Sequence, residues 1–327
     1  MGRQCYRKLY RRHRYRKDPH IIKTPAELAF FARSVNEGNR YENMYITLAA
    51  DIRLNDEKFT FDADTGLVKV TDGEHTAYFG TGVEGREGGN AYFDQTPSVK
   101  GAWYESDNSD TKTIYGGTLH EWTPIGDYKR SYDNRFRGHF DGNCHTVSGI
   151  YINSGNTMIG LFGYAFNAQI EEIQIDNSLS CGGIYTGSVA GYGNARFNGV
   201  TRRCINNGIV IGINCVGGIV GNNTSLFTED CYHAGSVEGN RNAGGIGGYA
   251  SSVKTCYSVG SIKGNEIKGG YHWLRSCGAC RGVLLLSIRK RSCGNGNRQM
   301  CCRIQRVYSG HQRGSHEIGG NLRRLYL

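Results

Sequence analysis

The sequence predicts an all-β fold, a right-handed parallel β-helix (β-solenoid) with an N-terminal helical cap and a β-rich insertion. The main observation is a glycine-framed apolar cassette that recurs at 160–163, 187–191, 217–221 and 244–248. The last glycines of successive cassettes are 28, 30 and 27 residues apart, and a fixed period of this length is typical of solenoids. The chain also holds 48 glycines and only 4 prolines, which favours a β-rich fold with many tight turns.

A second phrase that begins with cysteine follows the later cassettes, at Cys204, Cys231 and Cys256. If each repeat is one coil of the β-helix, equivalent residues stack on one another, about 4.8 Å apart. We therefore predict a column of buried thiols that pack as small hydrophobic groups. Packing is favoured over a disulfide because stacked equivalents bridge only where their Cβ vectors converge. By the same reasoning an aliphatic column forms from Leu161, Val189, Ile219 and Ile246, and Ile219 and Val220 alternate between the inside and the outside of the coil.

Charged residues precede the second phrase, and their sign alternates from one repeat to the next. The pairs are Glu171-Glu172, Arg202-Arg203, Glu229-Asp230 and Lys254-Thr255. Opposite charges on neighbouring strands stabilise a sheet by a few tenths to about 1 kcal/mol each. We predict a structural ladder of charges; the alternative is a carboxylate pair for glycoside chemistry.

Taken from the N-terminus, residues 1–18 hold eight Lys or Arg and one acid and show no periodicity. They are interpreted as a disordered basic arm or as a segment read out of frame. Residues 19–54 are predicted to be a cap. In this segment Thr24, Pro25 and Glu27 have the pattern of a helix start with a capping box, Gly38 ends the helix, and alternating apolar residues predict strands after it.

Residues 55–121 interrupt the rhythm and are predicted to be a projecting insertion. Its carboxylates Asp62, Asp64, Asp107 and Asp110 are of the type that binds calcium, but no complete calcium-loop spacing is present, so solvated loops are preferred. Trp103 and Tyr104, with Trp122 just beyond, are the candidate ligand-binding residues, as an aromatic platform for sugar or peptide. A place in the aromatic core is an equally good interpretation of these rings.

Residues 122–270 are predicted to form the β-helix itself. They carry Trp-x-Pro-Ile-Gly at 122–126, Phe-Asp-Gly-Asn-x-His-Thr at 140–146 with a strand on each side of the Asp-Gly-Asn turn, and then the cassettes. With Thr-Pro-x-Glu-Leu at 24–28, these motifs make residues 21–270 resemble bacterial GLUG-repeat proteins, although Cys144 stands where such proteins prefer glycine. The resemblance implies a parallel β-helix in a large surface or secreted protein. Some such relatives are joined to IgA-cleaving metallopeptidases, and the role implied for the repeats is binding.

Residues 271–327 carry Cys277-x-x-Cys280 and three further cysteines, 293, 301 and 302. No second Cys-x-x-Cys is present, so no metal site is predicted. Codons for Tyr271-His272-Trp273 read one base later encode Ile or Thr, Ile or Thr, and then Gly, which restores the expected cassette. This tail is therefore interpreted as a frameshifted, disordered end of a longer protein.

The net charge of +10 comes from the two ends, because residues 19–270 carry a net charge of −7. No nucleic-acid partner is therefore expected for this part of the chain. The sequence lacks the His-Glu-x-x-His, Gly-x-Ser-x-Gly and phosphate-loop motifs, so neither an enzyme nor a cofactor is predicted. No signal peptide is recognised, and the longest apolar run, 282–288, is too short to span a membrane.

The function expected is that of a non-catalytic extracellular or cell-surface module for adhesion or for binding a host or environmental glycan or surface protein. The alternatives are a carbohydrate-active β-helix enzyme and a spacer in a larger secreted protease or adhesin. An enzyme requires two or three acids gathered in one groove. An adhesin requires a shallow aromatic or polar strip.

Overall fold

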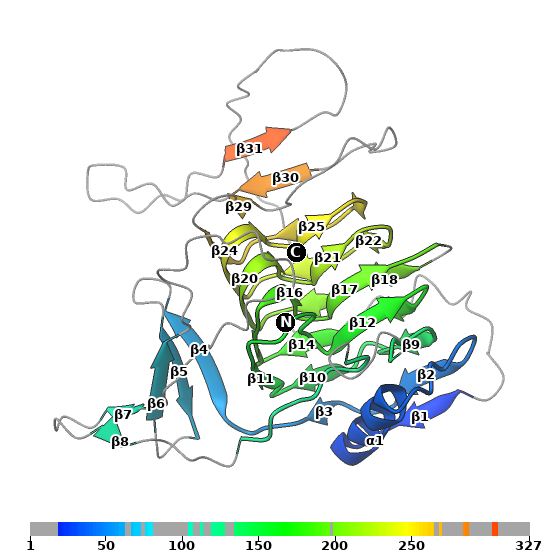
Figure 1. Cartoon of the computed structure of the whole chain (residues 1–327). Helices are drawn as coiled ribbons and strands as arrows, with labels where there is room; N and C mark the ends of the chain where they lie inside the picture. Colours follow the sequence, from blue (N-terminus) through cyan, green and yellow to red (C-terminus); the bar gives the residue numbers. More distant parts are fainter. Residues whose placement is uncertain are drawn as a thin grey trace.

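The computed structural model describes residues 19–62, 67–72, 76–80, 104–106, 112–113, 119–127, 134–196, 199–264, 268–269, 284–287 and 303–306. These residues form a β-solenoid of about seven turns with one helix at its N-terminal end (Figure 1). Four stacks of strands run along the solenoid, and every pairing within them is parallel. The predicted arm 1–18 lies outside the described residues, as does the tail 271–327 except for β30 (Leu284–Ser287) and β31 (Arg303–Arg306), an antiparallel pair.

The four stacks are named sheets A to D. Sheet A comprises β1 (His20–Ile22), β2 (Tyr45–Leu48), β9 (His139–Asp141), β13 (Gln169–Glu171), β18 (Val200–Arg202), β22 (Phe227–Glu229) and β26 (Val253–Lys254). Sheet B comprises β3 (Ile52–Arg53), β10 (Thr146–Ser148), β14 (Gln174–Asp176), β19 (Ile205–Asn206), β23 (Tyr232–His233) and β27 (Tyr257–Ser258). Sheet C comprises β11 (Tyr151–Asn153), β15 (Leu179–Cys181), β16 (Ile184–Gly187), β20 (Ile209–Gly217), β24 (Ser236–Gly244), β28 (Ser261–Gly264) and β29 (Lys268–Gly269). Sheet D comprises β12 (Phe162–Phe166), β17 (Ala190–Asn194), β21 (Val220–Asn223) and β25 (Gly247–Ala250).

Each sequence repeat is one coil, as predicted. In sheet D, Phe162 pairs with Ala190, Ala190 with Val220, and Val220 with Gly247. These partners are separated by the same 28, 30 and 27 residues as the cassettes. The period in the sequence is therefore the length of chain needed to pass once around the solenoid.

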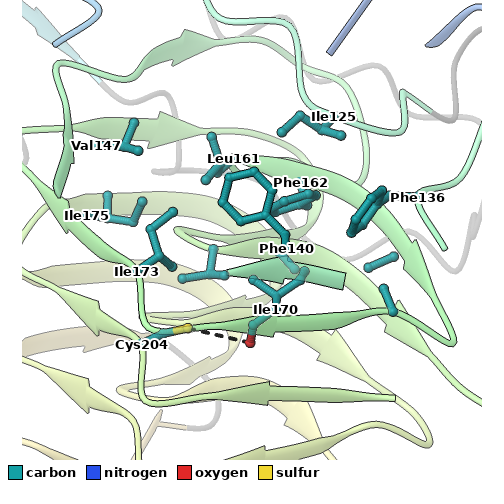
Figure 2. Packing of buried hydrophobic residues seen from close by; sticks show 14 of the residues in the cluster. Ile125, Phe136, Phe140, Val147, Leu161, Phe162, Ile170, Ile173, Ile175 and Cys204 are labelled. Carbon is teal, nitrogen blue, oxygen red and sulfur yellow. Dashed lines mark hydrogen bonds between the residues drawn. The ribbon is translucent and has the colours of Figure 1, made fainter. Parts of the chain in front are cut away.

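The core lies inside the coil and consists of apolar columns that run along the axis (Figure 2). The predicted aliphatic column is confirmed, since its four side chains are fully buried: Leu161, Val189, Ile219 and Ile246. Val220 is buried in the same cluster as Ile219, so the predicted alternation of these two residues is wrong. The cassette lies at a corner of the coil, and both of its central side chains turn inward.

The predicted thiol column is also confirmed. Cys204, Cys231 and Cys256 are buried and free, and the backbone N–H of Cys231 donates to Cys256 Sγ at 3.3 Å. Burial raises the pKa of the Cys231 thiol well above its usual value, and the neighbouring thiols of Cys204 and Cys256 add to this shift. The Cys231 thiol is therefore a neutral packing group at physiological pH.

The N-terminal cap is helix α1 (Pro25–Asn36), which lies at the β1 and β2 end of the stack (Figure 1). Thr24 caps it: the Thr24 hydroxyl accepts from Glu27 N at 3.2 Å, and the Glu27 carboxylate accepts from Thr24 N at 3.0 Å. Leu28, Phe31 and Val35 enter the central core cluster. The helix thus covers the apolar end of the first coil, which is the role of a solenoid cap.

The β-rich insertion is a five-stranded antiparallel sheet of β4 (Lys58–Asp62), β5 (Leu67–Thr71), β6 (Thr76–Gly80), β7 (Tyr104–Ser106) and β8 (Lys112–Thr113). Its Phe59, Val68 and Val70 pack in one cluster with Leu179 and Ile211 of sheet C. The insertion therefore rests on the outer face of sheet C, where it covers apolar side chains that the coil turns outward.

The Asp-Gly-Asn turn at 141–143 joins two strands, as predicted, but these strands do not pair with each other. The strand before the turn, β9, belongs to sheet A, and the strand after it, β10, belongs to sheet B. Asn143 and Cys144 have positive φ angles of 46° and 61°. A left-handed backbone favours glycine, which gives a physical reason for the glycine preference noted at position 144.

The core becomes polar toward the C-terminal coils of sheet B. One inward column passes from Val147 and Ile175 to Asn206, His233 and Ser258. His233 is fully buried, its Nδ1 lies 3.3 Å from Asn206 Nδ2, and its Nε2 has no hydrogen-bond partner. Burial lowers the pKa of His233 from its usual 6.5 to about 4.

This histidine is expected to make folding stability pH-dependent. Between pH 6.5 and about 4 the unfolded chain binds a proton at His233 that the folded chain excludes, so stability falls as the pH falls through this window. A shift of this size corresponds to a loss of about 3 kcal/mol by pH 4. Urea unfolding at several pH values should show this slope for the wild-type chain and a flatter slope for His233→Asn. An unchanged slope in the variant would assign the pH dependence to other groups.

Candidate functional site

The predicted charge ladder lies along one edge of sheet A. Strand register aligns Asp141, Glu171, Arg202, Glu229 and Lys254 on five successive strands. The predicted charged residues therefore do lie opposite one another on successive strands. The close ion pairs gather at the N-terminal end of the ladder, around Glu171.

Glu171 is the centre of this cluster and is 5% exposed. One carboxylate oxygen contacts Nε2 of His139, and the other accepts from Arg202 Nε at 2.7 Å and from Arg203 Nη2 at 2.5 Å. Burial alone would raise the pKa of Glu171, but the hydrogen bonds from His139 and Arg202 outweigh it and hold the pKa well below its usual range. Glu171 is therefore ionised and fully engaged.

Two further carboxylates flank Glu171. Glu172 accepts from Arg203 at 2.8 and 2.9 Å, and Asp141 accepts from the backbone N–H of Asn143 at 2.8 Å. Burial raises the pKa of Asp141, and the negative charges of Glu172 and Glu171 add to this shift. The cluster thus contains three acids, of which two are neutralised by arginine.

The second residue of each charged pair occupies a corner with left-handed backbone. The φ angles are 55° at Glu172, 53° at Arg203, 54° at Asp230 and 50° at Thr255. The first residue of each pair lies in a strand and the second turns the chain toward sheet B. The repeated doublet of polar residues therefore marks a corner of the coil, and the side chains of Glu171 and Glu172 are held there by Arg202 and Arg203 of the next coil.

A carboxylate pair for glycoside cleavage needs one acid to hold a proton and a second to act as base or nucleophile, about 5 to 10 Å apart across a sugar. Both oxygens of Glu171 and one of Glu172 are already bound by basic side chains. The geometry of the cluster favours the structural interpretation. Asp141 has a raised pKa, as a general acid requires.

Of the three predicted ligand-binding residues, only Trp122 has a side chain that the structure describes. Trp122 is 7% exposed and belongs to the core cluster, where its indole N–H donates to the backbone oxygen of Leu161 at 3.2 Å. This is the core alternative that the sequence left open. Tyr104 lies in β7 with its side chain outside what the structure describes, and Trp103 lies outside the described residues. So do Asp64, Asp107 and Asp110, and for Asp62 the side chain does.

A different aromatic strip lies on the outer face of sheet D. Register aligns Tyr164, Tyr192, Asn222 and Tyr249 on four successive strands; we call this column the tyrosine ladder. The residues on either side of it, such as Phe162 and Ala165, point into the core cluster, to which the ladder does not belong. Sequence analysis missed it, although a signal was present: each ladder residue directly follows the last glycine of a cassette.

Comparison with known proteins gives one partial similarity. A stretch of 101 residues, 30% of this chain, is 38% identical to halomucin from Haloquadratum walsbyi. The chain spans only 1% of the length of halomucin. No protein-family model matches this chain, and no solved structure matches it.

The described residues offer neither a metal site nor a membrane-spanning helix. They contain no group of three or more His, Cys, Asp or Glu side chains arranged to hold a metal ion. Among the same residues, no helix is long and apolar enough to cross a membrane.

Proposed function

We propose that this chain is a non-catalytic repeat module of an extracellular or cell-surface protein, of the GLUG-repeat kind, that binds a glycan or a surface protein of a host or of its environment. The observation that carries the proposal is that two of the clustered acids are bound by arginines of the neighbouring coil and are therefore not available for catalysis. Glu171 and Glu172 are bound by Arg202 and Arg203 of the next coil, so the charged groups join coils together.

Two further observations support this proposal. Stacked coils present long, flat outer faces, which solenoids use as binding surfaces. An adhesin requires a shallow aromatic or polar strip, and the partly exposed Tyr192 and Tyr249 on the sheet D face support this role. In addition, the partial similarity to halomucin is compatible with a location at the cell surface.

The carbohydrate-active enzyme is a second candidate because of Asp141 alone. Its raised pKa is a property of catalytic acids, but its neighbours Glu171 and Glu172 are bound by Arg202 and Arg203 and are not free to act with it. The same shift arises wherever a carboxyl is buried beside like charges. The structural explanation therefore accounts for Asp141 without a reaction.

Location and adhesion test the proposal together. On intact cells that produce the protein, a membrane-impermeant biotin reagent is expected to label the chain. The purified full chain is expected to bind immobilised glycans or extracellular proteins in an array. Labelling only after the cells are lysed would contradict the surface role, and an empty array would contradict the binding role.

A further inference from the structure

We infer that the outer face of sheet D is a binding surface for a neutral polysaccharide, with Tyr192 and Tyr249 of the tyrosine ladder as its contact residues. This inference rests on the proposed function and makes it specific, because it names the face and the chemical class of the ligand. It is carried by the aromatic geometry, by the polar groups, and by the lack of charged side chains in the ladder and in the corner column beside it.

The aromatic rings form a connected cluster outside the core. The Tyr164 and Tyr192 centroids are 5.3 Å apart with planes at 65°, and Tyr192 lies 5.3 Å from Tyr185. Tyr164 is 1% exposed and forms the floor of the cluster, whereas Tyr192 and Tyr249 are partly exposed. Tyrosine offers a rigid apolar face and a polar tip at low entropic cost, which suits it to contact surfaces.

The polar groups on this face are amides and hydroxyls. Within the part of the chain that the structure describes, the hydroxyls of Tyr192 and Tyr249 have no hydrogen-bond partner. Asn222 lies between them in the ladder, and Asn242 lies at the neighbouring corner, where its amide donates to Asn214 at 2.9 Å. Asn222 is itself buried and accepts from the Thr224 hydroxyl at 2.7 Å, so the groups open to a ligand are the two partly exposed rings and their hydroxyls. A ligand with apolar C–H faces and many hydroxyls matches these groups.

The ladder and the corner column beside it contain no charged side chain. The corner column consists of Met158, Tyr185, Cys215 and Asn242. At the N-terminal end of the face, Arg135 and Arg137 lie over the Phe166 ring at 4.6 and 5.4 Å, and Arg137 also pairs with Glu42 at 2.7 Å. These cations are already engaged by the protein, so the face favours an uncharged ligand.

The backbone of this face excludes one common mode of peptide binding. Strands β17 and β21 are paired on both sides, so neither offers a free edge to which an extended peptide could add as a strand. The three steps from Tyr164 to Tyr249 span about 14 Å at the usual strand spacing. A linear polysaccharide that lies along the ladder can contact both partly exposed rungs, Tyr192 and Tyr249, at once.

Affinity electrophoresis of the full chain in gels that contain neutral glucan, mannan or galactan, or anionic polygalacturonate, tests the inference. At least one neutral polysaccharide is expected to retard the wild-type protein, and retardation should persist in salt. Tyr192→Ala and Tyr249→Ala are each expected to weaken binding roughly five- to tenfold. Tyr192→Phe, which keeps the ring, should remain within about threefold of wild type.

Tyr257→Ala is the matched control, because Tyr257 is 40% exposed on sheet B and should not affect binding. Thermal unfolding of each variant by circular dichroism shows that the fold is intact. If Tyr192→Ala and Tyr249→Ala bind as tightly as wild type, the ladder is not the site, although the proposed function stands. If binding is confined to polygalacturonate and lost in salt, or to a protein, the ligand class is wrong. If the chain binds no polysaccharide and no protein, both this inference and the proposed binding role are wrong. The proposed location at the cell surface is tested separately, by the biotin labelling described above.

Discussion

Gly221→Ala is expected to destabilise the solenoid by about 3 kcal/mol or more. A Cβ atom at Gly221 would lie 2.5 Å from the backbone N of Thr186 and the backbone C of Tyr185 in the preceding coil. Those atoms belong to a corner that cannot move without breaking the parallel pairing on both sides. Insertion of one methyl group into a packed region usually costs about 1–3 kcal/mol, and a clash with backbone on both strands places this site at the upper limit or above it.

The same close approach recurs in other coils, which makes it a property of the fold. A Cβ at Gly191 would lie 2.3 Å from Met158 C, and one at Gly248 would lie 2.2 Å from Cys215 C. Each of these corner residues has a positive φ angle, between 53° and 63°. The last glycine of the cassette therefore recurs because the corner of the preceding coil occupies the space of its side chain.

Gly239→Ala provides the control for this prediction. At Gly239 the nearest atoms are side-chain atoms of Val216, at 3.0 and 3.1 Å, and no backbone atom is among the three nearest. We expect a loss below about 1.5 kcal/mol there. Guanidinium unfolding of both variants measures the difference. Equal stability of Gly221→Ala and Gly239→Ala would show that the corner does not press on the cassette glycine. Gly248→Ala, in a later coil, tests the same contact if Gly221→Ala does not fold.

Arg203→Glu is expected to cost about 2–4 kcal/mol and to lower the melting temperature by roughly 5–10 °C. The change removes the guanidinium that binds both Glu171 and Glu172 and places a third carboxylate beside them. Glu171 is buried, so its charge cannot be screened well by water. Removal of a partner from a buried pair costs about 3–5 kcal/mol; the lower range reflects the partial exposure of Arg203 and the remaining contact from Arg202.

The control for Arg203→Glu is Arg196→Glu, because Arg196 is exposed. A surface change of this kind usually shifts stability by less than about 0.5 kcal/mol. Arg241 is a poorer control, since it is partly buried in β24 and has a partner of its own. Arg203 has a positive φ angle, which strains glutamate and arginine equally because neither has the conformational freedom of glycine. Backbone strain therefore adds little to the difference in stability between Arg203→Glu and wild type. Similar melting temperatures for the two variants would mean that the ladder does not join the coils.

The elements that sequence analysis predicted are those with a local or periodic signal. The coil length follows from the spacing of the cassettes, because stacking in register forces equivalent residues to recur. The helical cap follows from Thr24, Pro25 and Glu27, which lie within four residues of one another. The thiol column follows from Cys204, Cys231 and Cys256 in the same way as the coil length.

Other features have no such signal. The left-handed corner at Met158, Tyr185, Cys215 and Asn242 uses four residue types, so no motif reveals it. The polar column at His233 occupies positions that an aliphatic column fills in earlier coils. The contact of the insertion with sheet C joins Phe59 to Leu179 and Ile211, and contacts so distant in sequence cannot be inferred from local patterns.

The candidate site likewise contains residues that the sequence predicted correctly and residues that it did not. Sequence analysis identified Glu171, Arg202 and Arg203 and assigned them a structural role, because alternating charge on a repeat implies neighbours of opposite sign. It also selected Trp122, an aromatic residue that the structure places in the core. The tyrosine ladder was missed because each of its residues follows a glycine at a corner of the coil. At such a corner the regular alternation of side chains along a strand does not show which side chain faces outward.

The central claim is that this solenoid binds its ligand without cleaving it, and one measurement tests this most directly. The full chain is incubated with each polysaccharide that it binds, and soluble products are followed by reducing-end assay and mass spectrometry. We expect the bound polysaccharide to be recovered uncut, with the same result for wild type and Asp141→Asn. Release of oligosaccharides by the wild type that is lost in Asp141→Asn would contradict the account and establish catalysis at the acidic cluster.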